Sequence, residues 1–173
     1  MAAQSIARGQ TVEAIAILKQ ALELDPLSPL LHSDLGWAYF SAEKFDRANA
    51  SLFQALELDP NFSQAHYWLG WTLNNMGKQG EAILEFETLL KIDPNSVMAR
   101  FGLGTMFALT GQRAGAMKVI KDLDRLATKR YVSPHSYAWI YLNLGQKETA
   151  LDLLEKAYEE RDPEMPYLKA DLV

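Results

Sequence analysis

The chain has few side chains of the types that carry out chemistry, and their spacing does not favour a metal site. It contains three histidines and no cysteine, which excludes disulfides and thiolate ligands. His32 and His66 stand 34 residues apart, and the next equivalent position holds Arg100 instead of an acidic residue. On neighbouring helices, roughly 8–10 Å apart, two such rings do not easily share one ion. We therefore expect packing or surface roles for both, with no bound metal or cofactor.

Catalytic patterns are also missing. The glycine-rich segment Gly77–Gly80 does not follow an expected strand, so it fails the context test for a phosphate-binding loop. No histidine, carboxylate and nucleophile recur together on one face. The carboxylates Glu81, Glu85 and Glu87 fall on one expected helix, where they predict a solvated outer face. We expect no catalytic residues, so the chain is not interpreted as an enzyme.

Composition limits the partners. The net charge is −5, and an acidic surface repels phosphate backbones, so nucleic acid is not an expected partner. No run of 18 apolar residues predicts a membrane span. The first eight residues lack the apolar stretch of a secretory signal, which favours a cytoplasmic location.

Small residues recur with a fixed period of 34. Gly36 returns as Gly70 and Gly104, and Ala48 returns three times. This period is typical of stacked helix–turn–helix units, in which small residues let paired helices approach closely. The chain then divides into a partial unit at 1–28, whole units at 29–62, 63–96, 97–130 and 131–164, and a tail at 165–173.

Stop signals are equally regular. Asp-Pro pairs at 25–26, 59–60 and 93–94 end three helices, because proline disfavours helical geometry in the preceding residue. Gly77, Gly111 and Gly145 stand where the chain turns inside a unit. Together these signals predict helices at 10–24, 29–42, 45–58, 63–76, 79–92, 97–110, 113–128, 133–144 and 147–160.

The pattern Leu69-Gly70…Leu73…Ala82…Phe86…Leu89…Pro94 resembles the tetratricopeptide repeat (TPR) over essentially the whole chain. The resemblance implies an all-α fold, a right-handed α-solenoid of tandem antiparallel helix pairs (the TPR superhelix), forming one domain over 1–173. It also implies a scaffold for protein–protein interaction. One departure concerns the tryptophan expected at the fourth place of each unit, which is replaced by His32, His66, Arg100 and Pro134.

A second resemblance covers the end of the chain. Tyr131-Val132-Ser133-Pro134, Leu144-Gly145, the segment 154–163 and Tyr167-Leu168-Lys169 resemble the terminal repeat of bacterial signalling proteins. In those proteins the repeats follow a kinase, a cyclase or a winged-helix regulator. Aligned by the period, both ends look cut, which predicts a piece of a longer protein. The alternative is a small protein whose residues 2–8 fold over the first helix.

Family geometry assigns the concave face to the first helix of each unit, at places two, five, six, nine, twelve and thirteen. On this basis we expect a ligand-binding groove, and Ser33 and Thr105 also fall at inner-face places. The expected groove residues are Trp37, Phe40, Tyr67, Trp71, Asn74, Asn75, Phe101, His135, Trp139 and Asn143. Aromatic rings suit the apolar side chains of a peptide, and the amides suit its backbone. The alternative is that the tryptophans only pack between adjacent helices.

The hypothesis is therefore a peptide or protein partner held in an aromatic-lined groove. The cationic clamp with which chaperone-binding relatives hold a terminal carboxylate is missing, so an acidic chaperone tail is not expected. The alternative function is self-association, as a homodimer or spacer, through the solenoid ends. These ends would expose Ile15, Leu18 and Leu22 on one side and Leu151, Leu154 and Tyr158 on the other.

Overall fold

The computed structural model describes residues 2–162, and of residues 2–10 it describes the backbone only. Within this range the chain forms nine α-helices and no strand. It divides into two compact units, Met1–Pro94 (unit 1) and Asn95–Val173 (unit 2).

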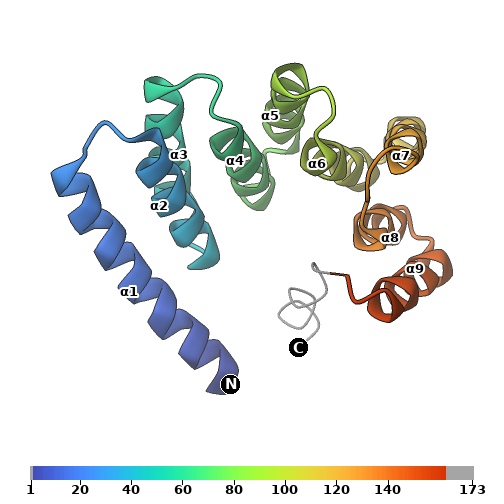
Figure 1. Ribbon diagram of the computed structural model, residues 1–173, viewed down its shortest axis with the longest axis horizontal. Helices are drawn as coiled ribbons and strands as arrows, with labels where there is room; N and C mark the ends of the chain where they lie inside the picture. Colours follow the sequence, from blue (N-terminus) through green and yellow to red (C-terminus); the bar gives the residue numbers. More distant parts are fainter. Residues whose placement is uncertain (1, 163–173) are drawn as a thin grey trace. The chain divides into compact units, whose positions relative to one another are not determined.

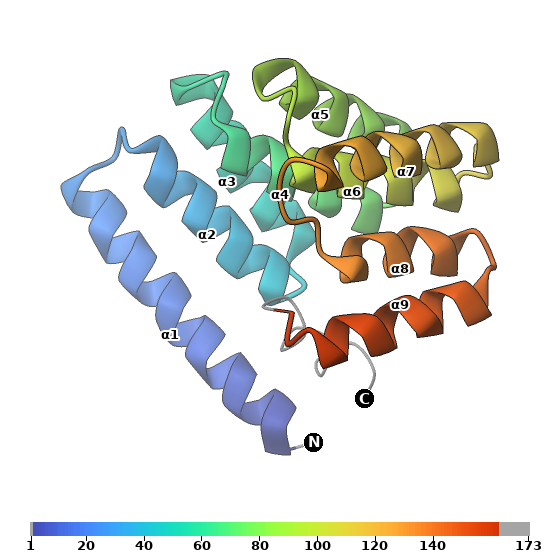
Figure 2. The same cartoon turned by 45° about the vertical axis from the view of Figure 1, so that its right-hand side comes forward.

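Short turns join consecutive helices into antiparallel pairs, α2 with α3 and α4 with α5 in unit 1, α6 with α7 and α8 with α9 in unit 2 (Figures 1 and 2). The helices are α1 (Ala2–Leu24), α2 (Pro29–Ser41), α3 (Phe45–Leu58), α4 (Ser63–Asn75), α5 (Gln79–Ile92), α6 (Val97–Leu109), α7 (Arg113–Ala127), α8 (Pro134–Asn143) and α9 (Lys147–Glu159). The all-α class and the helix pairs predicted from the period are confirmed. From α2 onward each predicted end lies within one residue of the observed one.

Residues next to the helix ends explain where the first helix of a repeat starts and where the second helix stops. The Ser28 side chain accepts a hydrogen bond from the backbone N–H of Leu31, and Pro29 stands at the first helical position. At the other end, Asp59 and Asp93 are extended, with φ of −139° and −126°. Each precedes a proline, which disfavours the helical conformation in the residue before it.

The turn inside each pair uses a left-handed residue. Gly77, Gly111 and Gly145 have φ of 78°, 73° and 78°. The equivalent residue between α2 and α3 is Glu43, with φ of 57°. A side chain in this conformation is strained, because its Cβ approaches the backbone too closely. The first whole repeat therefore makes the same turn as the others at a cost in stability.

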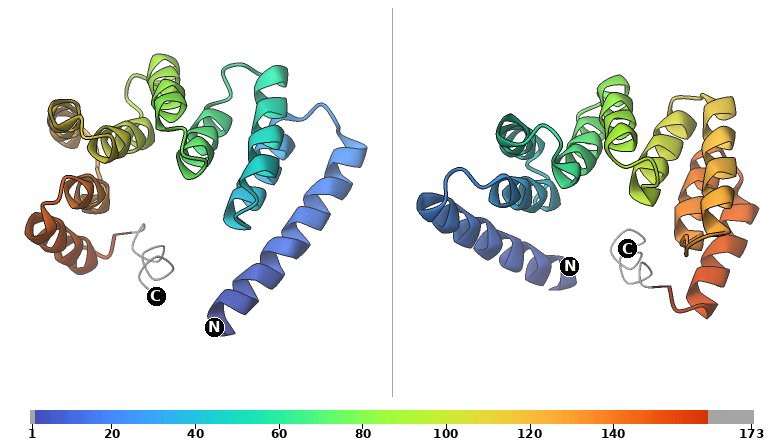
Figure 3. Two further views of the ribbon diagram at one scale, coloured as in Figure 1. Left: turned by 180° about the vertical axis from the view of Figure 1, so that it is seen from behind. Right: turned by 45° about the horizontal axis from the view of Figure 1, so that its top comes forward.

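Helix α1 differs from the prediction. We expected a helix from residue 10, with residues 2–8 either ending an earlier helix or folding over it. Instead one uninterrupted helix begins at Ala2 (Figure 3). Alanines and other good helix formers precede Gly9, and a single glycine inside a helix costs only about 1 kcal/mol. These residues therefore allow one helix to continue through Gly9.

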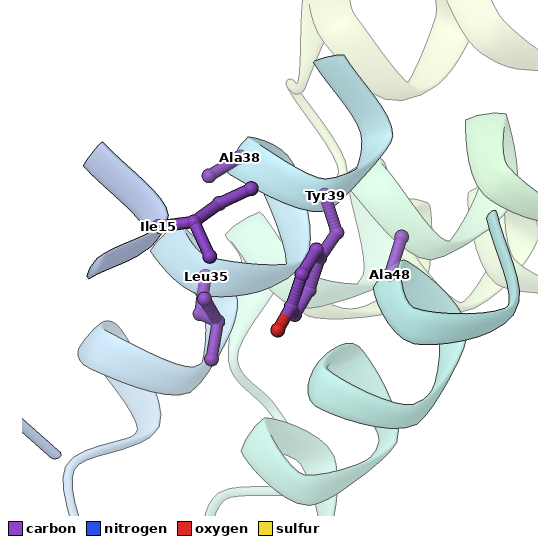
Figure 4. Packing of buried hydrophobic residues seen from close by; sticks show 5 residues of the cluster. All are labelled: Ile15, Leu35, Ala38, Tyr39 and Ala48. Carbon is purple, nitrogen blue, oxygen red and sulfur yellow. The ribbon is translucent and has the colours of Figure 1, made fainter. Parts of the chain in front are cut away.

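The core of unit 1 depends on close approach between paired helices. A Cβ added to Gly36 would lie 2.5 Å from Cγ of Leu52, and one added to Gly70 would lie 2.6 Å from Cζ of Phe86. Helix α1 covers the free side of α2 (Figure 4). There the buried cluster consists of Ile15, Leu35, Ala38, Tyr39 and Ala48.

Unit 2 uses its small residue differently. A Cβ on Gly104 would meet Cδ1 of Ile140 on α8 at 2.6 Å, and Val119 of its own pair at 3.0 Å. Helix α8 packs on α6. It begins at Pro134, three residues later than a strict period would place it. The linker before it spans 128–133.

Buried Asp162 fixes the end of this linker. Its carboxylate accepts hydrogen bonds from the hydroxyls of Tyr131 and Ser133. These three residues belong to the segment that resembles the bacterial signalling proteins, so part of that pattern has a structural role. The remaining part, Tyr167 to Lys169, and the tail at 165–173 lie outside the described residues.

Candidate functional site

Five aromatic side chains of α2 and α4 form a network of ring contacts in unit 1. We call them the aromatic face: Trp37, Phe40, Tyr67, Trp68 and Trp71. The ring of Trp68 lies 6.0 Å from that of Trp37 and 5.5 Å from that of Phe40, both on α2. It also lies 5.1 Å from the ring of Tyr67, its neighbour on α4. Trp68 therefore connects the two helices.

Trp68 is a candidate binding residue that the sequence analysis does not include. The period predicts that Trp37 and Trp71, 34 residues apart, lie side by side. In the structure Trp37 contacts Trp68 instead. The sequence could have indicated Trp68, because it is the sixth residue of the repeat at 63–96. The family geometry assigns this place to the concave face.

The tryptophans of the aromatic face differ in how much of their side chain is buried. Trp37 is 47% exposed. Trp71 is half-buried, and its ring lies 5.5 Å from that of Phe86, which is fully buried. Tyr67 also contacts Phe86, at 6.1 Å. Trp71 thus packs against the core, as the packing interpretation expects, while Trp37 keeps exposed surface and its role in a groove stays a prediction.

The asparagines expected to bind a peptide backbone are partly engaged by the protein itself. Asn75 donates from Nδ2 to the carbonyl oxygen of Trp71 at 2.9 Å. Asn143 makes the same contact with Trp139 at 2.8 Å. Asn74 is half-buried. Each bonded amide keeps its carbonyl oxygen and a second N–H for other contacts.

The remaining expected residues form a separate cluster in unit 2. His135 lies between Phe101 on α6 and Trp139 on its own helix, with ring centroids 6.0 Å away in each case. All three are half-buried. The expected groove residues therefore fall into two sets, one in each unit.

Two polar residues assigned to the concave face are instead buried. Ser33 is 0% exposed and Thr105 is 1% exposed. The Thr105 hydroxyl donates to the carbonyl oxygen of Phe101 at 2.8 Å. Among the described residues, the Ser33 hydroxyl has no hydrogen-bond partner. Because neither side chain reaches the surface, the expectation that they line the face is wrong.

His66 is held by two acceptors. Its Nδ1 lies 2.6 Å from Oε2 of Glu85, and its Nε2 lies 2.9 Å from the carbonyl oxygen of Pro60. Burial of the ring opposes its charge, but the hydrogen bonds to Glu85 and Pro60 and the charges of Glu85 and Asp59 outweigh this. The pKa of His66 is consequently raised above 6.5. The packing role predicted for His66 agrees with this geometry, whereas Glu85 pairs with the ring and does not only face solvent.

Two hollows have linings that include none of the five residues of the aromatic face. One, of about 680 Å³, is lined by residues 43–47 with Asn75 and Met76. The other, of about 580 Å³, lies between α7, α8 and α9 and includes Tyr137. Burial and the nearby Asp124 raise the pKa of Tyr137 to about 12. Within residues 2–162, no three histidine or carboxylate side chains gather as a metal-binding group.

Comparison with known families identifies the repeat. Two family models described as Tetratricopeptide repeat match the chain, one at residues 5–69 and one at 63–96 and 135–162. Together they cover more than half of it. Neither model matches the repeat at 97–130, although its helices α6 and α7 form the same kind of pair. No curated protein matches the sequence significantly.

Solved structures agree on the fold. A thermophilic TPR protein from Thermus thermophilus aligns with a TM-score of 0.75 at 18% identity, over 98% of this chain and 93% of that one. The second TPR domain of human RPAP3, in complex with the HSP70 peptide SGPTIEEVD, is 28% identical with a TM-score of 0.54, over 57% and 82%. The first TPR of Spaghetti (RPAP3), bound to the HSP90 peptide SRMEEVD, is 26% identical with a TM-score of 0.55, over 60% and 82%. None of the helices in the described part of the chain is long and apolar enough to cross a membrane.

Proposed function

Because the chain belongs to the tetratricopeptide repeat family, we propose that it is a non-catalytic scaffold that binds a peptide or partner protein through the aromatic face of unit 1. One observation carries the proposal: Trp37 stays 47% exposed while its ring packs on Trp68. A half-exposed indole on a rigid aromatic base offers apolar area that a ligand can cover with little loss of side-chain entropy. Two similar TPR domains were solved with peptides bound, which supports a peptide as the ligand class.

The expected affinity is modest. Fully burying an exposed aromatic side chain is worth roughly 1.5–3 kcal/mol, and Trp37 has about half of its surface left to bury. Contributions from Phe40 and Tyr67 are smaller because both are half-buried. Association itself costs about 4 kcal/mol or more, so these rings alone do not produce tight binding. We therefore expect weak, reversible binding.

The test is selection from a random-peptide display library on the parent protein, on Trp37→Ala and on Phe53→Ala. Phe53 is the matched control, since it is 46% exposed and lies on α3 in the same unit. Peptides that are enriched on the parent and on Phe53→Ala but lost on Trp37→Ala would support the aromatic face. The proposal is contradicted if both variants lose the enriched peptides equally. It is also contradicted if the same peptides are still enriched on Trp37→Ala.

Self-association is a second candidate, and one observation favours it. Leu151 and Tyr158 are 60% and 75% exposed, and they lie seven residues apart on one face of α9. At the other end the predicted residues were wrong. Ile15 is buried against α2, with Leu18 and Leu22 packed around it. Helix α1 exposes Val12 and Ile17 instead, at 61% and 58%.

The test of self-association is the mass in light scattering over a wide concentration range. A dimer through α9 should dissociate in a Leu151→Lys/Tyr158→Lys variant and persist in Leu84→Lys, whose leucine is also 60% exposed but lies on α5. A monomer mass at every concentration would remove this candidate. The link to bacterial signalling proteins and a cytoplasmic location stay predictions from the sequence.

A further inference from the structure

Charge is distributed unevenly between the two units. Residues 1–94 contain 6 lysines and arginines against 12 aspartates and glutamates, whereas residues 95–173 contain 11 against 10. The helices that carry the aromatic face are more extreme. Neither α2 nor α4 contains a lysine or an arginine, while α2 contains Asp34. Apart from the two histidines, Asp34 is therefore the one ionisable side chain on these two helices with a charge at neutral pH.

Asp34 lies one helical turn before Trp37, so their side chains share a face of α2. Its Oδ1 accepts a hydrogen bond of 2.7 Å from Nε2 of Gln64 on α4. This contact holds the carboxylate between the two helices that carry the aromatic rings. An ionised carboxylate accepts at both oxygens, and among the described residues Oδ2 has no such contact.

Two groups of unit 1 that can carry a positive charge are already engaged by other side chains. His66 and Glu85, 2.6 Å apart, form a pair with no net charge when both are ionised. Arg47 on α3 is already placed over a ring, 5.9 Å from the centroid of Tyr39. That contact also shows that unit 1 can hold a guanidinium against an aromatic side chain.

We propose that the ligand of the aromatic face is a peptide segment in which a lysine or arginine adjoins a bulky apolar residue. The apolar residue covers the exposed part of Trp37, and the cation lies over the indole with Asp34 as its counter-ion. This inference rests on the proposed function and narrows it to one class of peptide. Peptides rich in glutamate and aspartate are disfavoured, because they meet carboxylates and find no cation on α2 or α4.

The experiment begins with the strongest Trp37-dependent peptide from the library selection. It is synthesised in three forms, with its lysines and arginines kept, replaced by glutamine, or replaced by glutamate. Each form is titrated against the parent, Asp34→Asn and Glu57→Gln. Asparagine at 34 keeps an acceptor for Gln64 while removing the charge. Glu57→Gln removes the same charge from α3, away from the face.

The expected order of affinity is cationic, then neutral, then acidic, with at least about fivefold between the extremes. Asp34→Asn should weaken the cationic form by about two- to fivefold, the range of an exposed ion pair, and leave the neutral form unchanged. Glu57→Gln should change the affinity of neither form. Added salt should reduce the differences in affinity among the three forms.

The possible failures separate the two proposals. If all three forms bind equally and still depend on Trp37, the aromatic face is the site but its preference for cations is wrong. A selected peptide without any lysine or arginine leads to the same conclusion. If no peptide depends on Trp37, the proposed function fails and this inference fails with it.

Discussion

The same small residue of the repeat is used differently in the two units. In unit 1, Gly70 lies under the ring of Phe86 on the second helix of its own pair, where an added Cβ would be 2.6 Å from Cζ. In unit 2, the nearest atom to such a Cβ on Gly104 is Cδ1 of Ile140, on the next first helix. The linkers differ too, with residues 59–62 before α4 and residues 128–133 before α8.

The aromatic residues differ between the units in a related way. Trp68 joins the rings of α2 to those of α4, and the equivalent residue on α6 is Gly102, which is buried. In unit 2 the ring of His135 on α8 lies against that of Phe101 on α6. A sequence period predicts where a residue stands in the repeat, but the residue at the neighbouring place decides what it contacts.

The largest expected effect comes from adding a methyl group at the two glycines. Gly70→Ala should destabilise unit 1 by about 1–3 kcal/mol, because the Phe86 ring is fully buried and cannot move aside. Gly104→Ala should cost less, since the nearest atom is the end of a flexible isoleucine side chain. Chemical denaturation followed by tryptophan fluorescence measures both. Equal losses for the two variants would mean that the packing difference has no energetic consequence.

A smaller effect of opposite sign is expected at the turns. Glu43→Gly should stabilise the protein by up to about 1 kcal/mol, because glycine adopts the left-handed conformation without strain. Gly111→Ala, at the equivalent turn of unit 2, should destabilise it by a similar amount. Thermal unfolding of the two variants provides the comparison. Destabilisation by Glu43→Gly would show that the glutamate side chain contributes a contact that outweighs the strain.

The smallest expected effect is a pH dependence confined to unit 1. Since the folded pKa of His66 is raised above 6.5, its contribution to stability is complete below that pH and is lost as the pH rises through the folded pKa. The free energy of unfolding should therefore fall less steeply with rising pH in His66→Asn than in the parent. His32→Asn is the control, because His32 is in the equivalent repeat position and bonds to the carbonyl oxygen of Pro26, as His66 does to that of Pro60, but among the described residues it has no carboxylate partner like Glu85. Parallel pH curves for the parent and His66→Asn would contradict this role of the histidine.

The sequence predicted the helices well because their signals are local. Asp59 and Asp93 before proline, and glycines at the turns, act within a few residues of the helix ends. Helix α1 was mispredicted because the period expects a turn at Gly9, whereas a single glycine among good helix formers does not end a helix.

The candidate site was predicted less completely because it depends on contacts between helices. The period pointed to the first helices, but it paired Trp37 with Trp71 and overlooked Trp68. It also placed Ser33 on the inner face, although this side chain is completely buried. The pairing of His66 with Glu85 joins residues 19 apart on different helices, which no local pattern indicates.

The central claim is that the free surface of Trp37 is the contact for a peptide. Its most direct test is the dissociation constant of one selected peptide for the parent, Trp37→Ala and Phe53→Ala, after circular dichroism has shown that all three remain helical. We predict a roughly three- to tenfold loss for Trp37→Ala, corresponding to about 0.7–1.4 kcal/mol, and none for Phe53→Ala. Unchanged affinity in a folded Trp37→Ala variant would contradict the claim.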